Sequence, residues 1–185
     1  CRYEVIDDPF ITAANLINSG NIIGMFQGRS EAGARALGNR SILASPGGIK
    51  IRDEVNKRIK FRESFRPFAP VIKQDSANDY FEMDGAVSPY MCSTFPTYES
   101  KQEKLAAVTH VDGTSRVQTL SAKQNPGLYK VLEYYEKHTA LPVLLNTSFN
   151  LKGQAIVETP RDAIMTFFGC GLDKLILGNF LISKN

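Results

Sequence analysis

Cysteine, histidine and long apolar runs are scarce in this chain of 185 residues, and each scarcity excludes a class of protein. The cysteines, Cys1, Cys92 and Cys170, are odd in number and form no C-x-x-C pair, which argues against a disulfide scaffold and predicts a reducing, cytoplasmic location. Histidine occurs only at His110 and His138, so we predict no transition-metal site built from this chain. No apolar run is long enough to span a bilayer, and we therefore predict no membrane partner.

The composition and length predict one globular domain over residues 1–185. Hydrophobic residues make up 43% of the chain and charged residues 22%, which is typical of a folded domain with a core. The first ten residues lack the basic and then apolar regions of a signal peptide. Because the chain begins with cysteine rather than methionine, we expect it to be a piece of a longer protein.

Acidic residues are nearly missing from the stretch GRSEAGARALGNRS, residues 28–41, which contains Arg29, Arg35 and Arg40 but a single glutamate. Over residues 28–66 ten Lys and Arg residues face four Asp and Glu residues, whereas the rest of the chain has twelve basic and fifteen acidic residues. The positive charge is therefore local. This distribution favours an anionic ligand at one site over a generally basic protein that coats nucleic acid.

Capping signals predict where three helices begin. Asp8, Asn125 and Thr159 each precede a proline, the pattern of an N-cap followed by the first helical residue. Apolar residues at helical spacing follow each signal, and they also predict a helix over 49–59. In the helix after Thr159, the residues expected to face the core are Ile164, Phe167 and Phe168.

Apolar runs between these helices predict the strands. They occupy residues 21–27, 68–72, 105–111, 116–120 and 141–146, with one or two more strands in 175–182. Pro70 favours an edge position or a bulge for its strand, and Asp112-Gly113 predicts a turn that joins two strands. Residues 74–104 are polar and irregular and should form a long surface excursion. The alternation of strands and helices predicts an α/β or α+β domain with a mixed sheet.

Two basic segments carry possible binding chemistry. The arginine- and glycine-rich stretch 28–41 follows a predicted strand, as phosphate-binding loops do, but it matches neither the dinucleotide-binding nor the P-loop pattern. Its guanidinium groups suit bidentate contacts to phosphate, and the alternative is a plain surface loop. In residues 56–70 basic residues alternate with phenylalanines, which fits either the end of an amphipathic helix or a surface for single-stranded nucleic acid.

Two further segments add polar groups. Arg116 is a cation beside the predicted turn at Asp112, whereas His110 is interpreted as a structural histidine. Asn146, Thr147 and Ser148 follow a buried strand, the place where open α/β sheets put their sites. Ser148 lacks the flanking glycines of a nucleophile elbow, so we interpret it as a hydrogen-bond donor to a ligand, with a capped turn as the alternative.

Four of these segments together resemble one family. GRSEAGARALGNRSIL at 28–43, NKRIKFRESFRPFAP at 56–70, THVDGTSRVQ at 109–118 and NTSFNLKG at 146–153 are similar, in order, to motifs of the C-terminal domain of ATP-dependent O-carbamoyltransferases, which include the nodulation-factor, tobramycin and cephamycin enzymes. IVETPRDAI at 156–164 extends the similarity. The main departure is Ala34, where the family usually has a proline that would restrict the loop before Arg35.

The resemblance implies a fold and a reaction. The fold would be YrdC-like, as in threonylcarbamoyl-adenylate synthases: a twisted mixed sheet flanked by helices around a positively charged cavity. The domain would make carbamoyl-adenylate from ATP and carbamoyl phosphate, and an N-terminal transferase domain of the same polypeptide would pass the carbamoyl group to an acceptor. Mg²⁺ would accompany ATP, held mainly by phosphates. A nucleic-acid-binding module that uses the basic cavity is the alternative.

The resemblance also implies residue roles. Lys60, Arg66 and Arg116 would be the catalytic cations and would bind carbamoyl phosphate together with Ser148. The ATP-binding side chains would be Arg35, Arg40, Asn146 and Thr147. Their task would be to cancel the repulsion between two polyanions before carbamate attacks the α-phosphorus.

Overall fold

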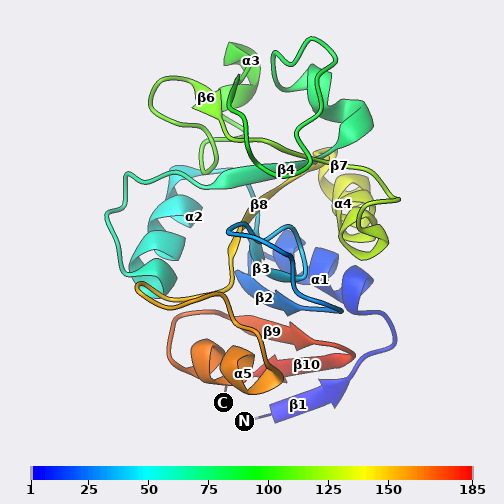
Figure 1. Cartoon of the computed structure of the whole chain (residues 1–185), viewed down its shortest axis with the longest axis vertical. Helices are drawn as coiled ribbons and strands as arrows, with labels where there is room; N and C mark the ends of the chain where they lie inside the picture. The colour runs from blue at the N-terminus through cyan, green and yellow to red at the C-terminus, as the bar shows by residue number, and fades with distance from the viewer. Residues whose placement is uncertain (1, 185) are drawn as a thin grey trace.

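The computed structural model describes residues 2–184 and is built on one twisted, mixed sheet of eight strands (Figure 1). Its order is β1-β10-β9-β2-β3-β8-β4-β7, with parallel pairing between β2 and β9 and between β4 and β7, and antiparallel pairing elsewhere. The strands are β1 (Arg2–Val5), β2 (Ile23–Phe26), β3 (Arg40–Ala44), β4 (Ala69–Lys73), β7 (Gln118–Leu120), β8 (Val143–Ser148), β9 (Lys174–Leu177) and β10 (Phe180–Ser183). A small second sheet pairs β5 (Phe95–Pro96) with β6 (Thr114–Ser115).

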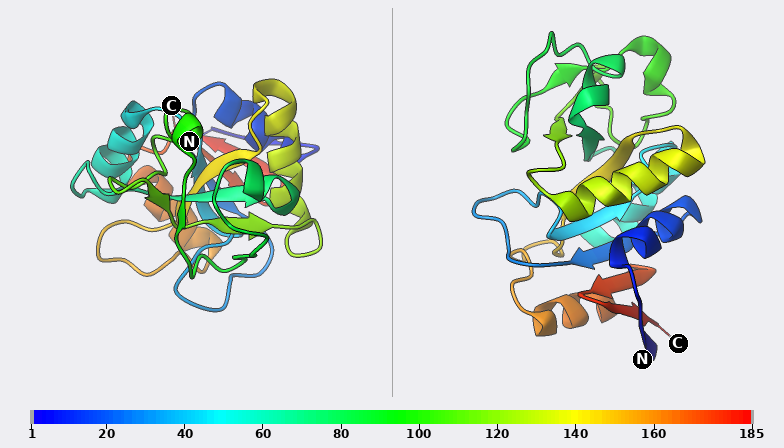
Figure 2. Two further views of the ribbon diagram at one scale, coloured as in Figure 1. Left: turned by 90° about the horizontal axis from the view of Figure 1, so that it is seen from above. Right: turned by 90° about the vertical axis from the view of Figure 1, so that its right-hand side faces the viewer.

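Helices cover both faces of the sheet. On one face α1 (Pro9–Asn18) lies beside α4 (Pro126–Thr139), as the right-hand view of Figure 2 shows. The opposite face is covered by α5 (Pro160–Phe168) and by α2 (Ile49–Glu54), which continues as the π-helix η1 (Val55–Lys60). The short elements η2 (Gln74–Asp79) and α3 (Glu99–Gln102) lie at the end of the molecule beyond β7. The predicted fold class, a mixed sheet flanked by helices, is confirmed.

The three predicted N-caps are confirmed, and each explains where its helix begins. The Asp8 carboxylate accepts hydrogen bonds from the backbone N–H groups of Phe10 and Ile11. The Asn125 side chain accepts one from the N–H of Leu128. Thr159 and the third residue of α5 form a reciprocal capping box.

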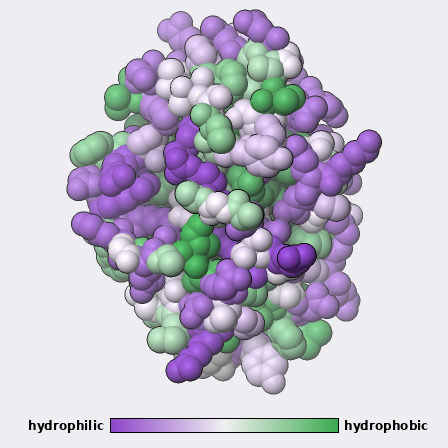
Figure 3. Space-filling model, in the orientation of Figure 1, coloured by the Kyte–Doolittle hydropathy of each residue, from purple (hydrophilic) through white to green (hydrophobic). Residues whose placement is uncertain are grey.

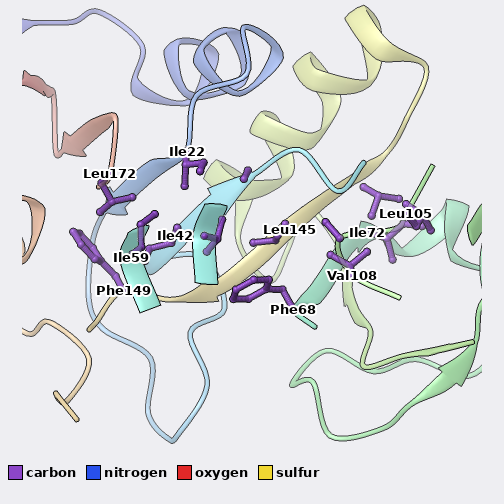
Figure 4. Packing of buried hydrophobic residues seen from close by; sticks show 14 of the residues in the cluster. Ile22, Ile42, Ile59, Phe68, Ile72, Leu105, Val108, Leu145, Phe149 and Leu172 are labelled. Carbon is purple, nitrogen blue, oxygen red and sulfur yellow. The ribbon is translucent and has the colours of Figure 1, made fainter. Parts of the chain in front are cut away.

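Alternation along the strands divides the core into two layers. In β8, Leu144 faces α1 and α4, whereas Leu145 faces the layer beneath η1 and α5. Figure 4 shows this second layer, in which Ile42, Ile59 and Phe149 are fully buried. Outside this core, the face drawn in Figure 3 is mainly hydrophilic, with hydrophobic residues interspersed. Within residues 2–184 no helix has both the length and the apolar character needed to cross a membrane.

The predicted edge position of Pro70 is wrong. Its strand, β4, lies inside the sheet, between β8 and β7. The parallel ladder to β7 begins only at Val71, one residue after the proline. Pro70 therefore lies where β4 has a partner on one side only, and its missing N–H breaks no bond to β7.

The predicted strand over 105–111 is also wrong. The backbone turns there, with the N–H groups of Val108 and Thr109 both bonded to the Leu105 carbonyl. The expected turn at Asp112-Gly113 is present, and it leads into β6 and then β7. Leu105 is nevertheless fully buried, because a helical turn can also place apolar residues in the core.

Two smaller predictions need adjustment. In α5 only Phe167 of the three expected core residues is fully buried, while Ile164 is 37% and Phe168 44% exposed. The segment 74–104 is largely irregular, as predicted. It is more than a surface excursion, since it buries Phe81 completely and Met91 almost completely.

Candidate functional site

A cavity of about 140 Å³ lies where β8 ends and β4 begins. Five separate segments build its wall: the loop between β2 and β3, the stretch from the turn after η1 to the start of β4, the stretch between η2 and β5, a residue between β6 and β7, and the last residues of β8. The lining residues are Ala34, Arg35, Ala36, Arg62, Pro67, Phe68, Ala69, Met91, Arg116, Asn146, Thr147 and Ser148. Sequence motifs that are far apart in the chain therefore meet at one place.

The register of the strands explains why these distant motifs lie at one cavity. β8 lies between β3 and β4, with Asn146 opposite both Leu43 and Ala69. The strand is apolar up to Leu145 and polar from Asn146 to Ser148, so its polar end emerges at the edge of the core. The site thus forms where a buried strand ends in hydrogen-bonding side chains.

Three arginines, Arg35, Arg62 and Arg116, line this cavity together. Burial lowers the pKa of Arg116, and the nearby charge of Arg35 lowers it further. Burial is also the main cause of the lowered pKa of Arg62; the charge of Arg66 lowers it further, that of Glu63 opposes this, and that of Arg116 has a smaller lowering effect. Within residues 2–184 no ion pair joins any of the three lining arginines to a carboxylate. The cavity lining therefore carries three cations that form no ion pair among the described residues, with the charge of Glu63 acting on Arg62.

Arg62 is held in position by Asn56, a fully buried residue of η1. The Arg62 Nε donates to Asn56 Oδ1 at 2.7 Å, and its guanidinium lies over the Phe68 ring at 4.7 Å. The Asn56 Nδ2 donates to the backbone carbonyls of Ser64 at 3.0 Å and Arg66 at 2.8 Å. One buried amide therefore fixes the whole turn that follows η1 and presents Arg62 to the cavity.

Lys60 joins the end of η1 to the end of β8. Its Nζ donates to the carbonyl and Oγ of Ser148, at 2.6 and 3.3 Å, and to the carbonyl and Oδ1 of Asn150, at 3.1 and 2.9 Å. Only 6% of the residue is exposed. Burial lowers the pKa of Lys60 to about 7, and the charge of Arg62 adds to that effect. In this structure Lys60 supports Ser148 from beneath the cavity.

Five residues chosen from the sequence line the cavity: Arg35, Arg116, Asn146, Thr147 and Ser148. Their roles toward a ligand stay predictions, as do those of the three chosen residues that lie outside the lining.

Of those three, Lys60 reaches the site through Ser148. Arg66 lies apart from the lining, with a side chain 54% exposed and 3.8 Å from Glu63. Arg40 is buried over Phe26, at 3.6 Å from the ring centre, and donates to the backbone carbonyls of Gln27, Gly28 and Asn39. These bonds hold the two ends of the arginine-rich loop together.

Sequence reasoning missed Arg62 as a lining residue. It is one of five cations in residues 57–66, and nothing in the segment separates it from the others. What distinguishes Arg62 from the other four cations is its hydrogen bond to the buried amide of Asn56. No sequence pattern predicts such a contact.

The histidine expected to be structural has a structural partner. The Nδ1 of His110 lies 3.2 Å from Thr114 Oγ1, and Asp112 Oδ1 accepts from the N–H of Thr114 at 3.0 Å. Both side chains are thus engaged in the turn. Over residues 2–184 no three His, Cys, Asp or Glu side chains form a group that could hold a metal ion.

Comparison with known proteins identifies the family. The family described as "Carbamoyltransferase C-terminus" matches residues 14–184. This chain belongs to the carbamoyltransferase C-terminus family. The chain is 47% identical over 180 residues to nodulation protein NolO of Bradyrhizobium diazoefficiens, and 46% identical over 183 residues to nodulation protein NolNO of Sinorhizobium fredii. Those matches cover 96% and 98% of the chain but 33% and 27% of the relatives, so this carbamoyltransferase domain spans a third or less of their length.

Solved structures support the fold of this carbamoyltransferase C-terminal domain. HypF of T. kodakarensis superposes with a TM-score of 0.62 at 18% identity, over 97% of this chain and 21% of that protein. Full-length HypF in a phosphate- and nucleotide-bound form gives a TM-score of 0.63 at 16% identity, over 95% of this chain and 22% of that protein. At these identities the likeness establishes a shared fold.

Proposed function

We propose that this domain activates carbamoyl phosphate with ATP and so forms carbamoyl-adenylate. Water would first cleave carbamoyl phosphate to carbamate and phosphate. A carbamate oxygen would then bond to the α-phosphorus of ATP while the bond from that phosphorus to the β-phosphate oxygen breaks, releasing pyrophosphate. The observation that carries the proposal is the cavity lined by Arg35, Arg62 and Arg116 without a carboxylate partner among the described residues.

Electrostatics explains why such a cavity suits this chemistry. Both substrates are anions, and their mutual repulsion opposes the approach of carbamate to the α-phosphorus. Guanidinium groups fixed before the substrates arrive offset this repulsion without reorganising during the reaction. Arg62, fixed by Asn56 and by the Phe68 ring, is preorganised in this sense.

Mg²⁺ would be bound mainly by ATP itself. No cluster of carboxylates suited to a metal exists within residues 2–184, so phosphate oxygens would supply most of the ligands. The ion would neutralise phosphate charge. The protein's own part would be to bind and orient the phosphates through its arginines.

The transfer to an acceptor belongs, in this proposal, to another part of the polypeptide. The relatives are three or more times as long as the segment that this chain matches. We expect an N-terminal transferase domain to hold the acceptor hydroxyl. The 185-residue chain alone should therefore release pyrophosphate slowly and should not carbamoylate alcohols.

The test is calorimetric titration with carbamoyl phosphate, and pyrophosphate release with ATP, Mg²⁺ and carbamoyl phosphate, for the natural chain and for Arg116→Ala. Loss of a charge-assisted contact should cost about 1.5–3 kcal/mol of binding, or roughly 10- to 150-fold in affinity. Arg161→Ala, which removes an exposed arginine of α5 outside the cavity lining, is the matched control. Unchanged binding in Arg116→Ala would contradict the proposal. Tight polynucleotide binding that falls steeply with salt, without carbamoyl phosphate binding, would favour the nucleic-acid alternative.

A further inference from the structure

The side chain of Asn146 has a hydrogen-bonding atom with no partner. Asn146 is 1% exposed, lies near the end of β8 and lines the arginine cavity. Its Nδ2 donates to the carbonyl of Ala36 at 3.2 Å and to Oε1 of Gln118 at 2.8 Å. Its Oδ1 is buried and accepts no hydrogen bond from the described residues. A buried acceptor without a hydrogen bond lowers the stability of the fold, so its presence requires an explanation.

The surrounding contacts fix which atom of this amide is the oxygen. Because a backbone carbonyl can only accept, the Ala36 carbonyl requires the nitrogen of Asn146 on its side. The neighbouring amide is fixed in the same way, since the Nε2 of Gln118 donates to the Leu37 carbonyl at 3.1 Å. Two backbone carbonyls of the arginine-rich loop therefore orient both amides, and the acceptor of Asn146 is left free.

A second free group belongs to the same cavity. The Nε of Arg116 is buried and has no acceptor among the described residues. Two residues that line the cavity thus carry one unpaired donor and one unpaired acceptor, in addition to its positive charge. A ligand that satisfies both must itself present an acceptor and an N–H or O–H donor next to an anionic group.

We infer that Asn146 Oδ1 accepts a hydrogen bond from the amino group of the carbamoyl moiety and so makes the site selective for carbamoyl over acyl phosphates. This inference rests on the proposed function. Carbamoyl phosphate carries a carbonyl acceptor, an NH₂ donor and a phosphate. Acetyl phosphate has the same shape and charge but carries a methyl group in place of NH₂, which would leave Oδ1 buried and unpaired. The family resemblance implied that Asn146 binds ATP. In this inference it would instead contact carbamoyl phosphate and determine the specificity for that substrate.

The test compares the dissociation constants of carbamoyl phosphate, acetyl phosphate and inorganic phosphate for the 185-residue chain by calorimetry. The natural chain should bind carbamoyl phosphate about 10-fold more tightly than acetyl phosphate, as expected for one hydrogen bond to a buried acceptor. In Asn146→Ala this ratio should fall to about one, because the acceptor is gone. Inorganic phosphate lacks the carbamoyl group and reports any general damage to the cationic cavity.

Each outcome of this comparison either supports the inference or overturns it. Asn18→Ala, an exposed asparagine at the end of α1, should keep the natural ratio. Equal binding of carbamoyl and acetyl phosphate to the natural chain would overturn the inference while the proposed function stands, and this measurement holds even if Asn146→Ala does not fold. Equal weakening of all three ligands in Asn146→Ala, with the ratio kept, would assign Asn146 a structural role only and would also overturn it. Absence of carbamoyl phosphate binding in the natural chain would refute the proposed function itself.

Discussion

Raising the pH should stabilise the folded chain through Lys60. Its ammonium is enclosed by oxygens of Ser148 and Asn150 and is almost completely buried. Burial lowers its pKa from 10.5 to about 7 in the folded state, while the unfolded chain keeps the ordinary value. Between those values the unfolded chain binds more protons than the folded one. The free energy of unfolding should therefore rise with pH across this window and fall as the pH drops toward 7.

The size of the effect follows from the pKa difference. Each unit between the folded and unfolded pKa corresponds to about 1.4 kcal/mol, so the full window represents about 5 kcal/mol. Over a practical range, from about pH 7 to about pH 8.5, the folded side chain loses most of its proton and the unfolded one keeps it. Integration over that range gives a gain of about 1.5 kcal/mol from Lys60 alone.

Urea unfolding of the natural chain and of Lys60→Met, at a series of pH values within that range, measures this contribution. Methionine is unbranched and only one atom shorter than lysine, and it has no proton to lose, so the difference between the two slopes isolates Lys60. The natural chain should show the steeper rise. Parallel pH dependences in the two proteins would show that Lys60 stays fully protonated, with its four oxygen neighbours outweighing burial, and would refute the reasoning.

Three further outcomes can be measured on the same chain. Arg62→Met should weaken carbamoyl phosphate binding by roughly 10-fold or more, because it removes a cavity cation. It should also lower the free energy of unfolding by about 1–3 kcal/mol, since it leaves Oδ1 of the buried Asn56 without its donor; unchanged affinity would exclude Arg62 from the site. Asn56→Ala should cost about 1–3 kcal/mol in urea unfolding, since it breaks three hydrogen bonds at the turn after η1; an unaltered midpoint would contradict that. Gly24→Ala should cost about 1–3 kcal/mol, because its Cβ would lie 2.9 Å from the Phe149 ring, and a neutral substitution would show that the ring can move away.

Local signals predicted α1, α2, α4, α5 and six of the ten described strands because they depend on short-range chemistry. An N-cap at Asp8, Asn125 or Thr159 acts within three residues, so the sequence contains the whole signal. The apolar residues at helical spacing after Asn125 are those of a helix, α4, that buries Leu128, Val131, Leu132 and Tyr135. The family motifs extended the prediction to the fold class, which no single segment could determine.

Errors arose where tertiary pairing decided the outcome. Nothing near Pro70 indicates that β7 joins β4 only from Val71 onward, so the edge prediction was reasonable and wrong. The residues after Leu105 have the apolar content of a strand but find no ladder partner, and they turn instead. Strand pairing is set by distant residues, and a sequence pattern carries little information about it.

The candidate site was predictable as a set of residue types but not as a geometry. Arg35, Arg116 and Ser148 belong to three different motifs and line one cavity, because β8 and the segments next to it bring those motifs together. Motif membership could not separate Arg62, which lines the cavity, from Arg66, which lies outside it. That distinction comes from one buried contact, the bond from Arg62 Nε to Asn56.

The unpaired arginines of the cavity should oppose stability while they favour binding. The charge of Arg35 lowers the pKa of Arg116 and the charge of Arg116 lowers that of Arg62, so these neighbouring charges make protonated Arg116 and Arg62 less favourable. An anion that enters the cavity relieves this repulsion in addition to forming its own hydrogen bonds, and ligand binding therefore adds to the free energy of unfolding. Arg35→Ala, which removes an exposed cation of the cavity lining, should accordingly leave the ligand-free chain at least as stable while it reduces the stabilisation that ligand provides, the relation expected where a binding site is maintained at a cost to the fold.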